Sequence, residues 1–163
     1  MRRFVCVLVL SGLAVLTVSK THAQNAPAPA YGMSLNAESA KKVAAAAIAE
    51  ARKKNLTMAI SVVDTAGNLV YFEKMDGTQT GSVNVSIEKA RSAVLFKRPT
   101  KSFQDTVAQG GVGLRMLGLP GAVPVEGGIP LMEAGKIVGA IGASGGTSEQ
   151  DGQCAQAGAN VMK

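Results

Sequence analysis

One serine of the sequence stands in a pattern that could support nucleophilic catalysis. Residues 142–146 read Gly-Ala-Ser-Gly-Gly, which fits the motif G-x-S-x-G with Ser144 at its centre. In serine hydrolases this motif joins a strand to a helix and leaves the serine Oγ exposed on a sharp turn. An apolar segment precedes Ser144 here, and a polar segment that becomes rich in alanine follows it. The chemistry then depends on which base could take the serine proton.

The first 23 residues have the organisation of a secretory signal peptide. Arg2 and Arg3 form a basic head, an apolar run follows, and Thr21 and Ala23 supply the small residues that precede a cleavage site. The apolar run is short for a membrane span, and an uncleaved anchor helix is the alternative interpretation. We therefore expect residues 1–23 to be removed and the protein to be periplasmic or secreted.

Removal of the signal peptide changes the chemistry that the chain can perform. The only histidine, His22, leaves with it, as does Cys6, so that Cys154 becomes the single cysteine. A Ser-His-Asp site needs a base, and Lys136 begins the strand on which Ser144 lies, so that it cannot fold back to the serine. We therefore reject a serine hydrolase. We expect Cys154 to be buried, because a lone cysteine cannot form an internal disulfide.

The overall composition argues against two further classes. The net charge of +6 falls by half on cleavage, because the signal peptide carries Arg2, Arg3 and Lys20 and no acidic residue. The sequence has no Trp and two Tyr, and no basic-aromatic interleaving that would support a nucleic-acid role. No pair of cysteines and no close carboxylate cluster has the spacing of a zinc site.

The glycines around Ser144 suggest another use of the same motif. Between the end of a strand and a helix start near Thr147, they can expose backbone N–H groups to the carboxylate or phosphate of a ligand. Alternatively, they only permit a tight corner between strand and helix. The segment is not a Walker loop, since no Gly-Lys-Ser/Thr follows. Both interpretations stay open at this point.

The pattern of apolar residues predicts the elements that must position these groups. Residues 24–33 read as a disordered Pro/Ala tether and residues 34–163 as a single domain. Helices are expected at about 34–55, 81–98, 100–109 and 148–162, and strands at 57–64, 68–75, 129–133 and 136–143. The segment 110–128 is rich in glycine yet apolar, as in loops that cover a pocket. Two hairpins with interspersed helices indicate an α+β sandwich on an antiparallel sheet.

Iron inside a porphyrin needs only one or two ligands from the protein, because the macrocycle supplies four. The residues that could donate to such iron are Tyr31, Tyr71, Met75, Thr100, Met116, Met132 and Cys154. Arg or Lys side chains could pair with the propionates. Met and Tyr at such positions are more simply interpreted as core, so that composition alone does not indicate haem.

Four stretches of the sequence together carry a family resemblance. They read ISVVDTAGNLVYFEKMDG (60–77), IEKARSAVLFKRPT (87–100), GGIPLMEAGKIVGAIGASGGTSEQD (127–151) and CAQAG (154–158). In order and spacing they resemble the GlcG/HbpS-type haem-binding family, which includes an extracellular haem-binding sensor protein and the C-terminal domain of some corrinoid adenosyltransferases. The resemblance runs from about Leu35 to Met162.

The resemblance implies a profilin-like α/β sandwich with a five-stranded antiparallel sheet, oligomers up to octamers, and haem as the ligand. It implies that Thr100, just past the second helix, contacts the iron. Other members use histidine, and residues 24–163 contain none. A hydroxyl binds ferric iron weakly, so that any haem would be exchangeable. The remaining residues assigned to cofactor binding are Lys89, Arg91, Met116, Gly128, Ser144 and Gly145.

Two other functions remain open beside haem binding. One is a small organic-acid site, in which the glycine corner (Gly142–Gly146) and Lys89 or Arg91 hold the carboxylate of the ligand. Such a site could also belong to a lyase or isomerase, whose general base would be Lys89, Asp76, Glu126 or Asp151. The simpler interpretation of Lys89 and Arg91 is a solvated helix face. The other is a structural oligomer with segment 110–128 as its interface. We favour a secreted or periplasmic, oligomeric haem-binding protein, a carrier, scavenger or sensor component, over an enzyme.

Overall fold

The computed structural model describes residues 27–162, and the predicted signal peptide lies outside this range. Within it, no helix combines the length and the apolar character that a bilayer crossing requires. The elements follow the predicted order. The helices are α1 (Ala37–Lys53), α2 (Ser82–Leu95), α3 (Lys101–Ala108) and α4 (Ser148–Ala159), with short 3-10 helices η1 (Gly111–Gly118) and η2 (Asn160–Met162).

The sheet consists of the two predicted hairpins. Strand β1 (Ala59–Val63) pairs with β2 (Leu69–Lys74), and β3 (Gly128–Glu133) pairs with β4 (Lys136–Ser144), both antiparallel. β1 and β4 also pair with each other, which gives the order β2-β1-β4-β3. β1 is buried throughout, as is β4 after Lys136, because both strands are central and covered on both faces. β3 is an edge strand, because it stands last in the strand order and pairs with β4 alone.

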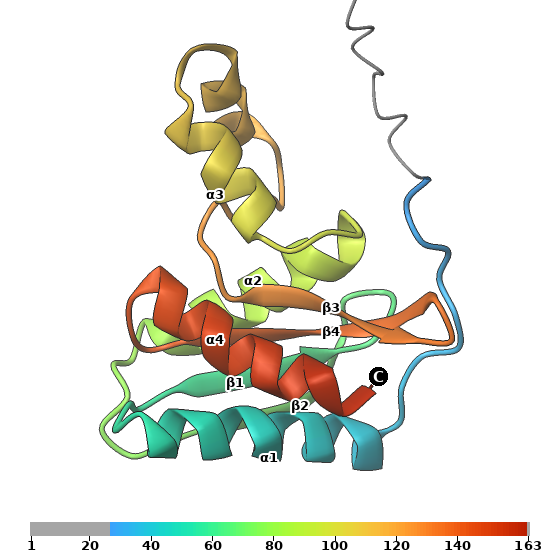
Figure 1. The fold of residues 1–163 in the computed structure, drawn as a ribbon, viewed down its shortest axis with the longest axis vertical. Helices are drawn as coiled ribbons and strands as arrows, with labels where there is room; N and C mark the ends of the chain where they lie inside the picture. The colour runs from blue at the N-terminus through green and yellow to red at the C-terminus, as the bar shows by residue number, and fades with distance from the viewer. Residues whose placement is uncertain (1–26, 163) are drawn as a thin grey trace, which may run out of the picture.

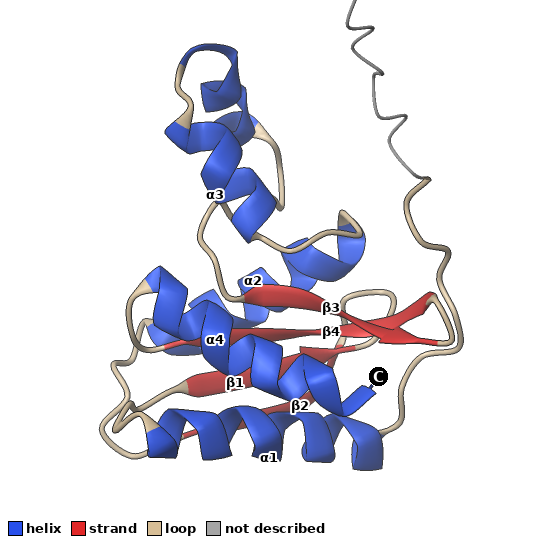
Figure 2. Cartoon of the chain, viewed as in Figure 1, coloured by secondary structure: helices blue, strands red, loops and turns tan. Residues whose placement is uncertain are grey.

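Helices cover both faces of the sheet, which confirms the α+β sandwich (Figures 1 and 2). α1 and α4 pack together on one face, and α2 packs on the other. Asn36 begins α1 by accepting a hydrogen bond from the Ser39 N–H at 2.8 Å. The predicted alanine-rich stripe of α1 is buried against the sheet. Small side chains on this stripe let the helix approach the strands closely.

The sheet has four strands rather than the five that the family resemblance implies. β1 ends at Val63, opposite Ala140, so that the first residues of β4 have no partner on that side. The N-terminal segment lies there, and Tyr31 makes a single parallel bridge to Ile137. The Gly32 N–H donates to the Ile137 carbonyl at 2.8 Å. The end of the predicted tether is thus held against β4, because it supplies the hydrogen bonds that β1 leaves unmade.

Glycine in β4 allows α2 to lie directly on the strand. A Cβ at Gly142 would overlap the Ser86 carbonyl oxygen and lie 2.7 Å from the Ala90 backbone nitrogen. Beside this contact, the Ser61 and Ser86 hydroxyls form a buried hydrogen bond of 2.7 Å. The close approach of α2 is what places Lys89, one turn further along, beneath the end of β4.

Residues 101–126 form an arm that projects from the sandwich (Figure 1). The arm comprises α3, η1 and the return to β3. The predicted irregular loop 110–128 thus contains a 3-10 helix, entered through Gly110 and Gly111, which have φ of 67° and 52°. Val112 and Leu117 on η1 are 81% and 64% exposed. The arm therefore carries apolar side chains into solvent.

Candidate functional site

The glycine corner after β4 binds a carboxylate that belongs to the chain itself. Asp151, in the first turn of α4, is 3% exposed. Its Oδ1 accepts the Gly146 N–H at 2.9 Å, and the Gly145 N–H is directed at the same carboxylate. The corner therefore stabilises an anion, as its glycines suggest, but the anion is Asp151 rather than a ligand.

Lys89 completes this cluster from the other side. Its Nζ donates to Asp151 Oδ2 at 2.7 Å and to the Ala143 carbonyl at 3.2 Å, and the residue is 1% exposed. Burial raises the pKa of Asp151 above its ordinary value, against the lowering effect of the Lys89 ammonium and of the glycine N–H groups. The interpretation of Lys89 as part of a solvated helix face is therefore wrong. The pair joins α2, β4 and α4.

Ser144 has no general base within hydrogen-bonding distance among the residues that the structure describes. Its Oγ donates to Ser82 Oγ at 3.1 Å, and the residue is 5% exposed. Lys136 lies at the opposite end of β4, as expected from the sequence. Gly145 lies against the backbone of Thr57 and Met58, just before β1, where a Cβ would overlap the Thr57 carbonyl oxygen. This environment supports packing of the strand end and not nucleophilic attack.

Thr100 and Gly128, two predicted site residues, contact each other. Thr100 is fully buried, and its Oγ1 accepts the Gly128 N–H at 2.9 Å. The Thr100 N–H in turn donates to the Gly128 carbonyl at 3.0 Å. A Cβ at Gly128 would lie 2.7 Å from Thr100 Cγ2, so that only glycine fits. Thr100 therefore provides hydrogen-bond partners for both backbone groups of Gly128, the first residue of β3, on the outer side of the strand.

Thr100→Val is expected to lower the free energy of unfolding by about 1–3 kcal/mol, because it leaves the buried Gly128 N–H without an acceptor. Valine keeps the side-chain shape, and Thr100→Ser keeps the hydroxyl and is the matched control. Urea denaturation of the two variants measures the difference. Equal stability of Thr100→Val and the unchanged protein would contradict this role of the hydroxyl. Iron contact by Thr100 stays a separate prediction, read from the spectra of haem complexes of the same variants.

Arg91 and Met116 lie away from the other predicted site residues. Arg91 follows Lys89 by two residues on α2 and therefore points to the far side of the helix. Its Nε donates to the Gly67 carbonyl at 3.1 Å, and its guanidinium pairs with Glu88. Met116 lies on η1 in the arm. Helical geometry explains why Lys89 and Arg91, only two residues apart in the sequence, have their side chains in different environments.

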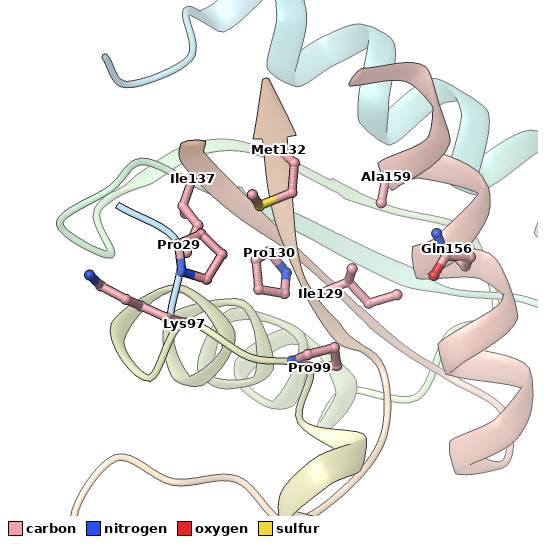
Figure 3. Close-up of a pocket in the computed structure, with 9 residues that line it drawn as sticks. All are labelled: Pro29, Lys97, Pro99, Ile129, Pro130, Met132, Ile137, Gln156 and Ala159. Atoms are coloured by element: carbon pink, nitrogen blue, oxygen red, sulfur yellow. The ribbon is translucent and has the colours of Figure 1, made fainter. Parts of the chain in front are cut away.

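A concavity lies along the outer edge of β3 (Figure 3). It consists of two adjoining cavities of about 400 and 340 Å³, which share Pro99, Ile129 and Gln156. We call them together the β3 groove. The larger cavity is lined by Pro29, Lys97, Pro99, Ile129, Pro130, Met132, Ile137, Gln156 and Ala159. The smaller is lined by Pro99, Lys101, Glu126, Gly127, Gly128, Ile129, Gly152, Gln153 and Gln156. Lys89, Arg91, Met116, Ser144 and Gly145 line neither cavity.

The edge of β3 presents side chains rather than free backbone donors to this groove. Pro130 has no N–H, and Thr100 takes both outer backbone groups of Gly128. A proline in an edge strand and a paired first residue both discourage the addition of another strand. Around this edge the larger cavity has mostly apolar walls. It suits an apolar small molecule rather than an extended peptide.

Two lysines border the groove, and sequence reasoning did not assign them to the site. Lys97 follows α2, and its Nζ lies 4.3 Å from the centroid of the Tyr31 ring. Lys101 begins α3 and pairs with Asp105 at 2.7 Å. The run Lys97-Arg98-Pro99-Thr100-Lys101 contains the usable signal, since Pro99 separates two helices and leaves cations on both sides of the break.

Comparisons with known proteins agree with this architecture. The family described as "Haem degrading protein HbpS-like" matches residues 35–160. Protein GlcG of Escherichia coli K12 is 37% identical over 110 residues, which are 68% of this chain and 81% of that protein. The crystal structure of HbpS has a TM-score of 0.73 at 32% identity, covering 81% of this chain and 92% of that one. The PduOC:heme complex has a TM-score of 0.72 at 27% identity, covering 80% and 96%.

The chain therefore belongs to the HbpS-like family, as its four sequence stretches predict. The match covers the sandwich, and it includes β3, α4 and the segment after α2 that border the β3 groove.

Proposed function

We propose that this protein binds haem in the β3 groove and that it is a secreted or periplasmic oligomer that carries, scavenges or senses haem. The observation that carries the proposal is an apolar cavity of about 400 Å³ with the Lys97 ammonium at its margin. Membership of the HbpS-like family supports it, as does the similarity to PduOC, a protein whose structure contains heme.

The residues of the groove fit the chemistry of haem. Ile129, Pro130 and Ile137 supply apolar surface for the macrocycle, and Lys97 and Lys101 can pair with its two carboxylates. Among residues 27–162 no group of three or more His, Cys, Asp or Glu is placed to hold a metal ion. Porphyrin-bound iron needs only one donor. Bound haem would supply redox-active iron, while the chain itself would hold the macrocycle, neutralise the carboxylates and exclude water.

The oligomer and the location are further parts of the proposal. Leu114 and Leu119 accompany Val112 and Leu117 on the exposed surface of the arm. Contact with another copy would remove these side chains from water, in line with the rule that exposed apolar patches mark contacts. The signal-peptide pattern of residues 1–23 supports export.

Titration of the purified protein with haemin tests the proposal. We expect a saturable shift of the Soret band at micromolar protein. Lys97→Glu is expected to weaken the affinity about tenfold, equivalent to about 1.4 kcal/mol, because a carboxylate would then face the propionates. Lys53→Glu on the exposed end of α1 changes the net charge equally and is expected to leave the affinity unchanged.

Two results would count against the proposal. Absence of any saturable Soret shift would remove haem binding altogether. Equal weakening by Lys97→Glu and Lys53→Glu would remove the groove as the site, since the effect would then follow net charge alone. Sedimentation of the same samples with and without haemin measures the oligomer.

A further inference from the structure

Met132 is the soft donor atom in the wall of the larger cavity. It lies on β3 and packs partly against the α2-side core of Val63, Ala90 and Ile137. The β3–β4 register shifts between Leu131 and Met132, and such a bulge re-aims the side chain that follows it. Figure 3 shows the sulfur turned inward toward Pro130 and Ile137, among the apolar side chains of the cavity.

The other candidate donors are engaged or lie elsewhere. The Tyr31 hydroxyl donates to the Val94 carbonyl at 2.8 Å, and the Tyr71 hydroxyl donates to Glu73. Thr100 is buried against Gly128. Cys154 is fully buried, and burial raises the pKa of its thiol to about 11, which keeps it protonated. Met75 and Met116 line neither part of the groove.

The polar residues of the groove are poorer donors to iron than a thioether. The ammonium group of a lysine has no lone pair, and Lys97 lies with its charge over the Tyr31 ring. The hydrogen bond with Asp105 raises the pKa of Lys101 and holds it protonated. Glu126 lines only the smaller cavity, where its carboxylate lies against Gly152 of α4, and it does not line the larger cavity that would hold the macrocycle.

We infer that the Met132 thioether is an axial ligand of the iron when haem is bound in the β3 groove. The inference rests on the proposed function and specifies its metal-binding atom. A thioether is a soft ligand, favours ferrous iron and raises the reduction potential of a haem. The protein then binds ferrous haem more tightly than ferric haem, in contrast to the hydroxyl ligation expected from Thr100.

Two ligands and two variants test the inference. Haem in both oxidation states and iron-free protoporphyrin IX are titrated into the protein, into Met132→Leu and into Met116→Leu. Leucine keeps a similar apolar volume without the sulfur, and this kind of exchange is well tolerated. Met116→Leu is the matched control, because Met116 lies in the arm. Loss of an outer partner of a metal ligand already costs about 10–100-fold in affinity, so that loss of Met132 is expected to cost ferrous haem at least about tenfold.

The expected result is specific to iron and to one methionine. Met132→Leu loses ferrous affinity and the near-infrared sulfur-to-iron charge-transfer band of the ferric complex, while protoporphyrin affinity stays unchanged. Met116→Leu retains all three properties. Unchanged protoporphyrin binding also shows that the Met132→Leu groove is folded. In the carbon monoxide complex of the reduced, unaltered protein, in which the iron is low-spin, a methionine methyl proton signal is expected to be shifted strongly upfield by the porphyrin ring current.

The outcomes separate this inference from the proposed function. If the protein binds haem and Met132→Leu keeps the charge-transfer band and the ferrous affinity, Met132 is not the ligand and haem binding stands. If neither haem nor protoporphyrin binds the unaltered protein, the proposed function fails and the ligand assignment fails with it.

Discussion

Asp151→Ala is expected to lower the free energy of unfolding by about 3–5 kcal/mol, because it leaves the Lys89 ammonium buried without its partner. The carboxylate accepts hydrogen bonds from Lys89 Nζ at 2.7 Å and from the Gly146 N–H at 2.9 Å. Both donors lose their acceptor in the variant. Urea denaturation followed by circular dichroism measures the loss.

Formate provides a sharper test of the same cluster. It is a carboxylate without a side chain, and it fits the volume that Asp151→Ala vacates at the glycine corner. We expect millimolar formate to raise the melting temperature of Asp151→Ala in a saturable way, since binding to the folded state alone stabilises it. Larger carboxylates such as benzoate are expected to fail. This result would show that the corner is an anion site that the chain fills with its own side chain.

Glu149→Ala is the matched control for Asp151→Ala. Glu149 is an acidic residue in the same first turn of α4, but it is exposed and has no ion pair in the structure described here. Its loss is expected to cost less than about 1 kcal/mol, the typical contribution of a helix-dipole interaction at the surface. Its stability is expected not to respond to formate beyond the response of the unaltered protein. Equal destabilisation by both variants would contradict the assignment of the buried pair.

Gly142→Ala is expected to destabilise the protein by about 3 kcal/mol, at the upper end of the range for overpacking. The new methyl group would overlap the Ser86 carbonyl oxygen, and the Ala90 nitrogen lies 2.7 Å from the Cβ position. These obstructing atoms are backbone, so that no change of rotamer relieves them. α2 must move away from β4, which also lengthens the Ser61–Ser86 hydrogen bond of 2.7 Å.

Gly118→Ala is the control for this substitution. Gly118 lies on η1, and a Cβ there would meet no heavy atom within 4 Å. Its effect is expected to stay within about 0.5 kcal/mol, as for surface positions in general. Urea denaturation compares the two variants. If Gly142→Ala were as mild as Gly118→Ala, the direct contact between α2 and β4 would be wrong.

The glycine corner and the β3 groove have different roles in the molecule. The Gly-Ala-Ser-Gly-Gly corner, Lys89 and Asp151 form a buried cluster that joins α2, β4 and α4. The β3 groove beside it is open, and its larger part is apolar with Lys97 at the margin. The first region therefore contributes stability, and the second is the one that a ligand can reach.

The order of helices and hairpins could be predicted from the sequence because it depends on local patterns. Alternation and turn residues define the strands around residues 64–68, and the alanine stripe with Asn36 defines α1. The single histidine, His22, lies in the predicted signal peptide, and on that expectation the sequence argued against a Ser-His-Asp site. The four family-like stretches identified the HbpS-like family, because their order and spacing can be read from the sequence without knowing which residues are in contact.

Partners across the sheet were decided only by the tertiary structure. Asp151 meets Lys89 because packing of α2 and α4 on opposite faces brings together residues 62 positions apart. Nothing in the sequence separates Lys89, which is buried, from Arg91 two residues later, because the difference depends on which side of α2 faces β4. The groove likewise exists because β3 ends the sheet, and strand order is a property of the folded chain. Thus local residue patterns determined the elements and the family, while long-range packing determined which residues line the site.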